Sequence, residues 1–422
     1  MNQRSKIAIL GFGLEGMAML DYLIEHQYPN ITVCDKNVDI KHKMPKGVSV
    51  ALGDEYLNDL ERFDVLIRSP GVKWLEPQIQ SVLKMGKEVI SGTSFFIDHC
   101  ICPIIGVTGT KGKGTTCSLI YEILKKVKFK VHLGGNIGEP AVGFLDKLKG
   151  DHVVVLEMSS FQLQGLSASP KYAILLNTTA DHLDYHADVE EYMQAKENLL
   201  AHQGKNSLAI LNKDYEYVKY YKPIVKGDLR WVSRSEKVDN GAYEKGGEIF
   251  YCKKGKCEKV LNVKDIAMIG SHNVENVLCA VAMAKELSVS NKDILYAVKK
   301  FKGLPHRLEF VAECKGTSEK LSSTALAGNF DPHVLAVHSG SKFPNRLVSN
   351  SFSEVPKGIK FYNDSFSTTP GTSMAAVDSF DVPTVLIAGG CDKGLDYDEW
   401  AVKILTKESL RVVILIGKIA DK

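Results

Sequence analysis

The chain has 422 residues, which is too long for one ordinary core and predicts about three domains. Hydrophobic residues make up 44% and charged residues 24%, a composition that excludes a largely disordered chain. Basic residues exceed acidic ones by only three, 53 against 50, which gives no reason to expect nucleic acid or an anionic membrane as a partner. No apolar run is long enough for a transmembrane helix, the N-terminus does not resemble a signal peptide, and the nine cysteines lack zinc-ligand spacing. We therefore expect a cytoplasmic protein with reduced thiols.

Strand and helix patterns alternate at the start of the chain. Apolar runs predict strands at residues 6–10, 31–34 and 64–67, and helical spacing covers residues 17–26. This rhythm is typical of a parallel sheet with crossover helices. We expect a Rossmann-like N-terminal domain over residues 1–100.

A second α/β segment follows, over residues 101–307. The runs at 104–107, 153–156 and 173–176 are almost entirely apolar, as expected for strands covered on both faces. Residues 218–263 show short polar strands and turns, which predict a small antiparallel excursion. Helical spacing returns at 272–287 and 292–301.

A third domain is expected over residues 308–422. Strand patterns at 360–362, 384–387 and 412–415 predict another Rossmann-like unit, so the whole chain is of the α/β class. Residues 317–357 are serine-rich with weak periodicity and indicate an inserted segment rather than core elements.

The strongest chemical signal is the glycine-rich loop from Gly109 to Thr116, between an apolar strand and a helical pattern. Glycines let backbone N–H groups approach phosphate oxygens, and the helix N-terminus adds partial positive charge. Lys113 is the candidate for the terminal phosphates, and Thr115 is the candidate Mg²⁺ ligand because Gly114 follows the lysine. The alternative is a glycine-rich turn without a ligand.

A second glycine pattern, G-x-G-x-x-G from Gly11 to Gly16, follows the first predicted strand, and Asp35 ends the next one. This is the dinucleotide-binding fingerprint, and alone it would suggest NAD. A nucleotide-sugar diphosphate fits it equally well. Tight packing of helix on strand, with no ligand, is the structural alternative.

Polar residues at strand and helix ends complete the candidate site. Glu157 ends a buried strand and could hold Mg²⁺ or act as a helix cap, and His182 follows another strand within an Asp- and His-rich turn. By pattern alone Lys196 is a surface lysine of a helix. Asn273 and Asn276 share one face at a helix start, where they could contact adenine or serve as caps.

In this order, these motifs resemble those of the Mur ligase family, the ATP-dependent amide ligases of peptidoglycan precursor synthesis. The resemblance covers almost the whole chain except residues 317–357. It is most specific to the members that add D-glutamate, in four stretches: Ser69–Gly71, Gly134–Gly138, Glu157–Leu163, and Asn363–Ser365 with Ser367 and Thr368.

The resemblance implies a role for each matching residue. UDP-substrate contacts are implied for Gly13, Leu14, Asp35, Ser69, Gly71 and Asn136. ATP contacts are implied for Gly109, Thr110, Lys111, Gly112, Lys113, Gly114, Thr115, Thr116, Asn273, Asn276, Arg307 and Asp364. Thr368 and Lys393 would contact the amino acid. Two Mg²⁺ ions are implied, the first held by Thr115 and Glu157, the second by His182 and by Lys196 carbamylated on its amine, with Lys113, Glu157, His182 and Lys196 as the catalytic set.

The implied reaction joins D-glutamate to UDP-N-acetylmuramoyl-L-alanine through an acyl phosphate, in a monomer. The alternatives are a sister ligase that adds another amino acid such as L-alanine, and a catalytically impaired nucleotide-binding fragment or paralogue. A dehydrogenase would leave the loop at Gly109 unexplained. The chain departs from the family pattern at Phe366, where a lysine is usual, and the family's third domain normally runs beyond Lys422, so we expect that domain to be incomplete.

Overall fold

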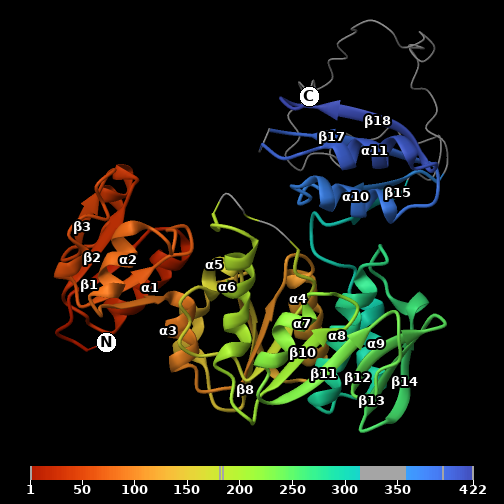
Figure 1. Cartoon of the computed structure of the whole chain (residues 1–422), viewed down its shortest axis with the longest axis horizontal. Helices are drawn as coiled ribbons and strands as arrows, with labels where there is room; N and C mark the ends of the chain where they lie inside the picture. The colour runs from red at the N-terminus through yellow and green to blue at the C-terminus, as the bar shows by residue number, and fades with distance from the viewer. Residues whose placement is uncertain (1, 180–181, 183–184, 314–357, 392–393, 421–422) are drawn as a thin grey trace, which may run out of the picture. The chain divides into compact units, whose positions relative to one another are not determined.

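A computed structural model describes residues 2–179, 182, 185–313, 358–391 and 394–420. The chain divides into two compact units, Met1–Leu304 and Pro305–Lys422 (Figure 1). Each unit is α/β, and the first holds two separate sheets. The predicted domain borders at residues 100 and 307 stay predictions.

The first sheet is a five-stranded parallel sheet with the order β3-β2-β1-β4-β5. Its strands are β1 (Ile7–Leu10), β2 (Ile31–Asp35), β3 (Ser49–Leu52), β4 (Val65–Arg68) and β5 (Glu88–Ser91), with helices α1 (Leu14–Glu25), α2 (Pro77–Lys84) and α3 (Gly92–His99). The predicted β1, β2 and β4 are confirmed, but β3 and β5 were missed because these short edge strands are only partly buried. The strand order reverses between β1 and β4, and α/β sheets typically bind ligands at the carboxyl ends of the strands at such a switch point.

The second sheet has nine strands in the order β14-β13-β12-β11-β10-β9-β6-β8-β7. The strands are β6 (Ile104–Thr108), β7 (Lys130–Gly135), β8 (His152–Glu157), β9 (Tyr172–Leu175), β10 (Leu208–Asn212), β11 (Asp228–Ser233), β12 (Gly241–Lys245), β13 (Glu248–Lys253) and β14 (Lys256–Asn262). The antiparallel excursion predicted over 218–263 is only partly right. β11 and β12 continue the parallel sheet, and only β13 and β14 are antiparallel. In that hairpin Cys252 and Cys257 face each other and form a disulfide, so the expectation of reduced thiols is wrong for this pair.

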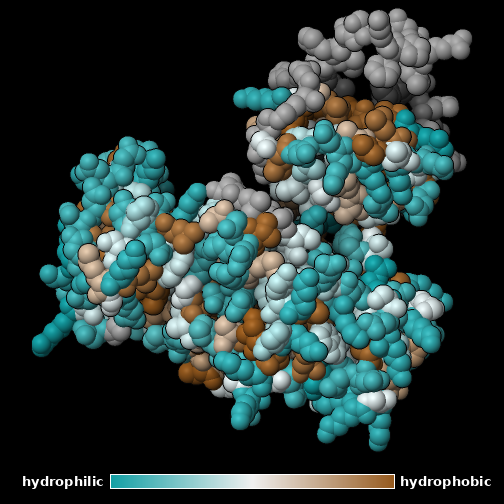
Figure 2. Space-filling model, in the orientation of Figure 1, coloured by the Kyte–Doolittle hydropathy of each residue, from teal (hydrophilic) through white to brown (hydrophobic). Residues whose placement is uncertain are grey.

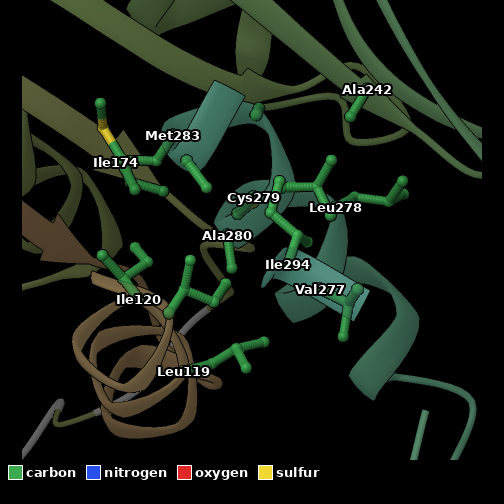
Figure 3. Close-up of a cluster of buried hydrophobic side chains, with 14 of the residues drawn as sticks. Leu119, Ile120, Ile174, Ala242, Val277, Leu278, Cys279, Ala280, Met283 and Ile294 are labelled. Carbon is green, nitrogen blue, oxygen red and sulfur yellow. The ribbon is translucent and has the colours of Figure 1, made fainter. Parts of the chain in front are cut away.

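Helices α4 (Lys113–Lys126) and α8 (Asn273–Glu286) pack together against the nine-stranded sheet. Figure 3 shows Leu119 and Ile120 of α4 facing Ala280 and Met283 of α8, with Ile174 of β9 beside them, and all five side chains are buried. Full burial of such side chains contributes about 1.5–3 kcal/mol each. This core fixes α4, and therefore the loop before it, relative to β6. Four further α-helices belong to the described part of this unit: α5 (Ser160–Leu163), α6 (Val189–Ala201), α7 (Val218–Tyr221) and α9 (Asn291–Lys300). Short 3₁₀ helices lie at Val38–Lys43, Leu60–Arg62, Ala141–Lys147, Lys222–Ile224 and Val263–Asp265.

The second unit holds two small sheets. β15 (Glu309–Glu313) pairs antiparallel with β16 (Lys360–Asn363), and β17 (Thr384–Gly389) pairs parallel with β18 (Leu410–Ile416), alongside α10 (Pro370–Asp378) and α11 (Asp398–Thr406). All three predicted strands of this region are confirmed. β17 and β18 expose apolar side chains such as Ile387 and Ile414, and Figure 2 shows hydrophobic surface on this unit. The predicted insertion at 317–357 lies outside the described residues.

Within the described part of the chain, no helix combines the length and apolar character needed to cross a bilayer.

Candidate active site

The glycine-rich loop connects β6 to α4, so the strand and helix predicted around it are confirmed. Gly109 and Gly112 have φ of +152° and +86°, a backbone region that favours glycine. A Cβ at Gly112 would lie 2.3 Å from Asn276 Oδ1, and one at Gly109 would lie 2.6 Å from the Leu176 side chain. The loop therefore needs glycine at both positions, and it ends at the N-terminus of a 14-residue helix, where the helix dipole favours an anion.

Side chains around the loop hold its shape. Lys113 donates through Nζ to the Gly109 and Thr110 carbonyls at 3.0 and 3.1 Å, so its ammonium lies over the loop. The Thr110 hydroxyl lies 2.8 Å from the Tyr192 hydroxyl and donates to the Thr179 carbonyl at 2.9 Å. A loop held at both ends keeps its N–H groups ordered before a ligand binds.

Glu157 ends β8 and is buried beside the start of α4. Its carboxylate accepts from Asn136 Nδ2 at 2.8 Å, and its carbonyl accepts from the Asn136 N–H at 2.9 Å. A Cβ at Gly114 would lie 3.0 Å from Glu157 Oε2, which places the carboxylate against the helix turn that carries Thr115. Carboxylate and hydroxyl oxygens are ligands that suit Mg²⁺.

Among the described residues, no group of three or more His, Cys, Asp or Glu side chains could hold a metal. Mg²⁺ does not need one, because it is usually held by one or two carboxylates, phosphates and water. The donor set at Glu157 and Thr115 therefore fits Mg²⁺ bound together with a polyphosphate.

Lys196 lies on α6 and is fully buried. Its Nζ donates to the Gly109 carbonyl at 3.1 Å and to the Thr108 hydroxyl at 3.4 Å, and it lies 4.6 Å from the Tyr192 ring centre. The pattern-based interpretation of Lys196 as a surface lysine is wrong, because α6 turns this side chain toward the loop. His182 is exposed, has a left-handed backbone with φ of +55°, and its ring lies 4.9 Å from that of Phe161.

Asn273 and Asn276 lie at the start of α8 with their side chains bonded to each other at 2.9 Å. Asn276 Oδ1 also accepts from the Thr116 hydroxyl at 3.2 Å, and Asn273 Nδ2 donates to the Ile269 carbonyl at 2.6 Å. The structure thus places this pair directly behind the loop. Their predicted contact with adenine stays a prediction.

The second glycine pattern lies between the carboxyl end of β1 and the first turn of α1. The Ser69 hydroxyl donates to the Gly11 carbonyl at 2.6 Å, and the Asp35 carboxylate accepts from the Phe12 N–H at 2.6 Å. A Cβ at Gly16 would lie 2.2 Å from the Gly11 carbonyl oxygen, which explains this glycine by packing alone. The space beside the Gly13 and Gly71 Cα atoms is open, and the Leu14 side chain is 70% exposed. The structure thus brings Asp35 and Ser69 to the Gly11–Phe12 backbone, next to Gly13 and Leu14.

Four predicted residues lie in the second unit. The Arg307 guanidinium lies 4.5 Å from the Phe366 ring centre, and Asp364 accepts from the Leu308 N–H at 3.0 Å. Thr368 is exposed just before α10. Lys393 lies outside the described residues.

Sequence reasoning gave no individual role to Glu15 of α1 or Gln162 of α5, whose side chains are bonded with Glu15 accepting from Gln162, and burial raises the pKa of the Glu15 carboxyl. Ser159 and Gln162 have the spacing of a capping box, which the structure contains. His186 belongs to the same Asp- and His-rich stretch as His182, which the sequence indicates as a possible metal or substrate site. His186 lies 2.8 Å from the Ser160 hydroxyl and 2.6 Å from the Glu191 carboxylate, and burial lowers the pKa of His186.

These features define a class of protein: an α/β protein with a glycine-rich loop between β6 and α4 and a second glycine pattern at the carboxyl end of β1, both of which are typical of nucleotide-binding proteins. Comparisons with known proteins narrow this class. Residues 107–284 match the Mur ligase middle domain, and residues 5–91 match the Mur ligase MurD-like N-terminal domain.

Full-length relatives agree. A UDP-N-acetylmuramoylalanine--D-glutamate ligase of Clostridium botulinum (strain 657) is 31% identical over 427 residues, covering 99% of this chain and 81% of that protein. One from Acetivibrio thermocellus is 33% identical over 428 residues, covering 100% and 82%. The chain belongs to the Mur ligase family.

Solved structures share the fold. MurF ligase from Thermotoga maritima in complex with ADP has a TM-score of 0.54 at 14% identity, covering 98% of this chain and 86% of that one. MurF from Acinetobacter baumannii has a TM-score of 0.55 at 15% identity, covering 99% and 79%. At such identities the likeness establishes the fold alone.

Proposed function

We propose that this chain is an ATP-dependent, ADP-forming ligase that joins D-glutamate to UDP-N-acetylmuramoyl-L-alanine in peptidoglycan precursor synthesis. The observation that carries the proposal is the arrangement of Glu157, Asn136 and the Gly109–Thr116 loop around the first turn of α4. This arrangement suits phosphoryl transfer, and two D-glutamate ligases, 31% and 33% identical, match 99% and 100% of the chain.

The carboxyl end of the N-terminal sheet would anchor the UDP end of the substrate. Asp35 can accept hydrogen bonds from uracil or ribose, Leu14 offers an exposed apolar surface, and the open space beside Gly13 and Gly71 leaves room for a diphosphate near Ser69. Binding energy from this remote end can position the reacting carboxylate. Asn136, bonded to Glu157, would meet the muramoyl-alanine end near the phosphates.

The loop would hold ATP. A carboxylate is a poor acylating agent because oxide is a poor leaving group, and transfer of the γ-phosphoryl group to it creates an acyl phosphate. Backbone N–H groups and Lys113 would gather and neutralise the phosphate oxygens. Mg²⁺ supplies further charge neutralisation when bound, held at Thr115 and Glu157.

A second Mg²⁺ would be held by His182 and Lys196. Carbamylation of the Lys196 amine replaces a cation with an anionic oxygen ligand, which suits a hard metal ion. The buried position of Lys196 against the Gly109 carbonyl supports a role at the loop.

The amine of D-glutamate would then attack the acyl phosphate through a tetrahedral intermediate, the amine proton would leave, and phosphate would depart as the amide forms. Arg307 and Asp364 would contact the nucleotide, and Thr368 and Lys393 the amino acid. We further expect the enzyme to act as a monomer, which light scattering during gel filtration would test.

The deciding experiment measures phosphate release from ATP with UDP-N-acetylmuramoyl-L-alanine and each amino acid in turn. We expect release with D-glutamate and little with L-glutamate or D-alanine. Phosphate release only in an assay that contains L-alanine and UDP-N-acetylmuramate would favour a sister ligase. ATP binding without any release would indicate an impaired paralogue and overturn the proposal.

A further inference from the structure

Arg68, the last residue of β4, is a fully buried arginine at the junction between the two sheets of the first unit. Its Nη2 donates to the Phe161 carbonyl at 2.6 Å, and its Nη1 donates to the Tyr185 hydroxyl at 3.0 Å. Both partners belong to the part of the chain that carries the nine-stranded sheet. The guanidinium also lies 5.4 Å from the Trp74 ring centre.

The same guanidinium fixes the turn that would hold the UDP moiety. Arg68 Nη1 donates to the Val72 carbonyl at 2.7 Å, and the Tyr185 hydroxyl donates to that same carbonyl at 2.9 Å. The Val72 N–H in turn donates to the Ser69 carbonyl at 3.0 Å, which closes the turn. The position of residues 69–72 is therefore set in part by Tyr185, which belongs to the part of the chain that carries the nine-stranded sheet.

Tyr185 is hydrogen-bonded to the backbone of His182. The N–H groups of Tyr185 and His186 both donate to the His182 carbonyl at 3.0 Å. The Phe161 ring lies 4.1 Å from that of Tyr185 and 4.9 Å from that of His182. One guanidinium is thus linked to the turn at Ser69–Val72 directly and to the His182 carbonyl through Tyr185.

Burying the Arg68 guanidinium is unfavourable for the stability of the fold. Within the described residues no carboxylate forms an ion pair with Arg68, its Nε has no hydrogen-bond partner, and burial lowers the pKa of Arg68. Well-packed apolar side chains often hold such a junction at least as firmly as a buried charge. The three bonds of the guanidinium instead specify how the Ser69–Val72 turn is oriented relative to Phe161 and Tyr185.

We propose that Arg68 is a positioning residue that, through Tyr185, couples the turn at Ser69–Val72 to the His182 backbone, so that the two ends of one long substrate meet their binding groups at a fixed separation. The inference rests on the proposed function for what the Ser69–Val72 turn and His182 bind.

Tyr185→Phe is the mildest test, because the ring stays and only the hydroxyl is lost. Arg68→Met removes the donors at similar length, and Arg62→Met is the matched control, since Arg62 is exposed on the same domain and lies over the Phe63 ring. We expect Tyr185→Phe to lower the melting temperature by only about 2 °C. It should raise both the KM for the UDP substrate and the Mg²⁺ concentration for half-maximal rate about tenfold. Arg68→Met should show the larger effect, and Arg62→Met none.

A merely structural role would lower the melting temperature while leaving the KM for the UDP substrate and the Mg²⁺ concentration for half-maximal rate unchanged. That result in Tyr185→Phe would overturn the inference.

A measurement that needs no turnover distinguishes failure of this inference from failure of the proposed function. In amide hydrogen exchange, Arg68→Met should speed exchange at the N–H groups of Ser69, Gly71 and Val72 together with those of residues 185–186, with little change in α4. If exchange stays unchanged at either 69–72 or 185–186, the coupling is overturned, whichever substrate the enzyme uses. If instead the proposed function is wrong, the wild-type protein will be inactive as a ligase while Arg68→Met still speeds exchange at both segments.

Discussion

Asn136 holds Glu157 by two hydrogen bonds, one from its side chain to the carboxylate at 2.8 Å and one from its N–H to the carbonyl at 2.9 Å. The amide thus fixes both the backbone and the carboxylate of the residue proposed to bind Mg²⁺. Residues that orient a metal ligand typically affect metal affinity or activity about 10- to 100-fold.

Asn136→Ala should therefore raise the Mg²⁺ concentration for half-maximal rate about tenfold. Steady-state phosphate release over a Mg²⁺ titration measures this. Asn30→Ala, at an exposed position of the first unit, is the control and should behave as the wild type. An unchanged Mg²⁺ dependence in Asn136→Ala would remove the proposed role of Glu157 as a metal ligand oriented by this amide.

Lys196→Ala should lose activity by about a hundredfold or more, because the proposed carbamate oxygen is then missing from the metal site. A small carboxylate such as acetate should restore part of the rate by occupying the cavity. The measurement is the rate as a function of acetate concentration. Lys226→Ala is the control, because the Lys226 ammonium donates to the Ala201 carbonyl and has no proposed role in the reaction. Full activity of the unrescued variant would show that the buried amine serves only to bind the Gly109 carbonyl.

Phe366 stands where the family usually has lysine, and the structure shows the Arg307 guanidinium over its ring. The stacking is worth about 0.5–1 kcal/mol at an exposed site, so Phe366→Ala should raise the KM for ATP about two- to fivefold. Phe366→Tyr keeps the ring and should match the wild type, and Phe361→Ala controls for loss of an exposed phenylalanine. Equal KM values for all four proteins would contradict a role of this ring in placing Arg307.

Glu15 gives a pH-dependent prediction. Burial raises the pKa of Glu15 in the folded state, so the folded state binds more protons than the unfolded state above the ordinary glutamate pKa, and stability is lost as pH rises through this window. Glu15→Gln removes the penalty and should raise the melting temperature by a few degrees at neutral pH, with the gain shrinking as pH falls toward 4.5. Glu25→Gln, exposed on the same helix, is the control. A melting-temperature gain that is constant with pH would show that the Glu15 carboxylate carries no burial penalty.

The sequence predicted those parts of the fold and site that depend on local pattern. The apolar runs of β1, β6 and β8 and the glycines at Gly109 and Gly112 carry their own signals, since buried parallel strands are uniformly apolar and left-handed turns favour glycine. Edge strands β3 and β5 bury too little to leave such a pattern.

Residues whose role depends on tertiary contacts could not be predicted from pattern. Lys196 has the spacing of a surface lysine, and only the packing of α6 against β6 and β9 buries it at the loop. A single arginine at the end of a strand, such as Arg68, is typical of a solvated residue, and its three acceptors lie 4 to 117 residues away along the chain. The resemblance to a family placed Lys196 at the site, but nothing in that resemblance pointed to Arg68 or Tyr185.

The central claim, that the chain forms an amide through an acyl phosphate, is tested most directly by isotope transfer. UDP-N-acetylmuramoyl-L-alanine labelled with ¹⁸O in its carboxylate is turned over with ATP, Mg²⁺ and D-glutamate, and the released phosphate is analysed by mass spectrometry. An acyl-phosphate route places one ¹⁸O atom in each phosphate released, in step with amide formation. Phosphate that carries no label would mean that water or another acceptor takes the γ-phosphoryl group, and would contradict the ligase mechanism.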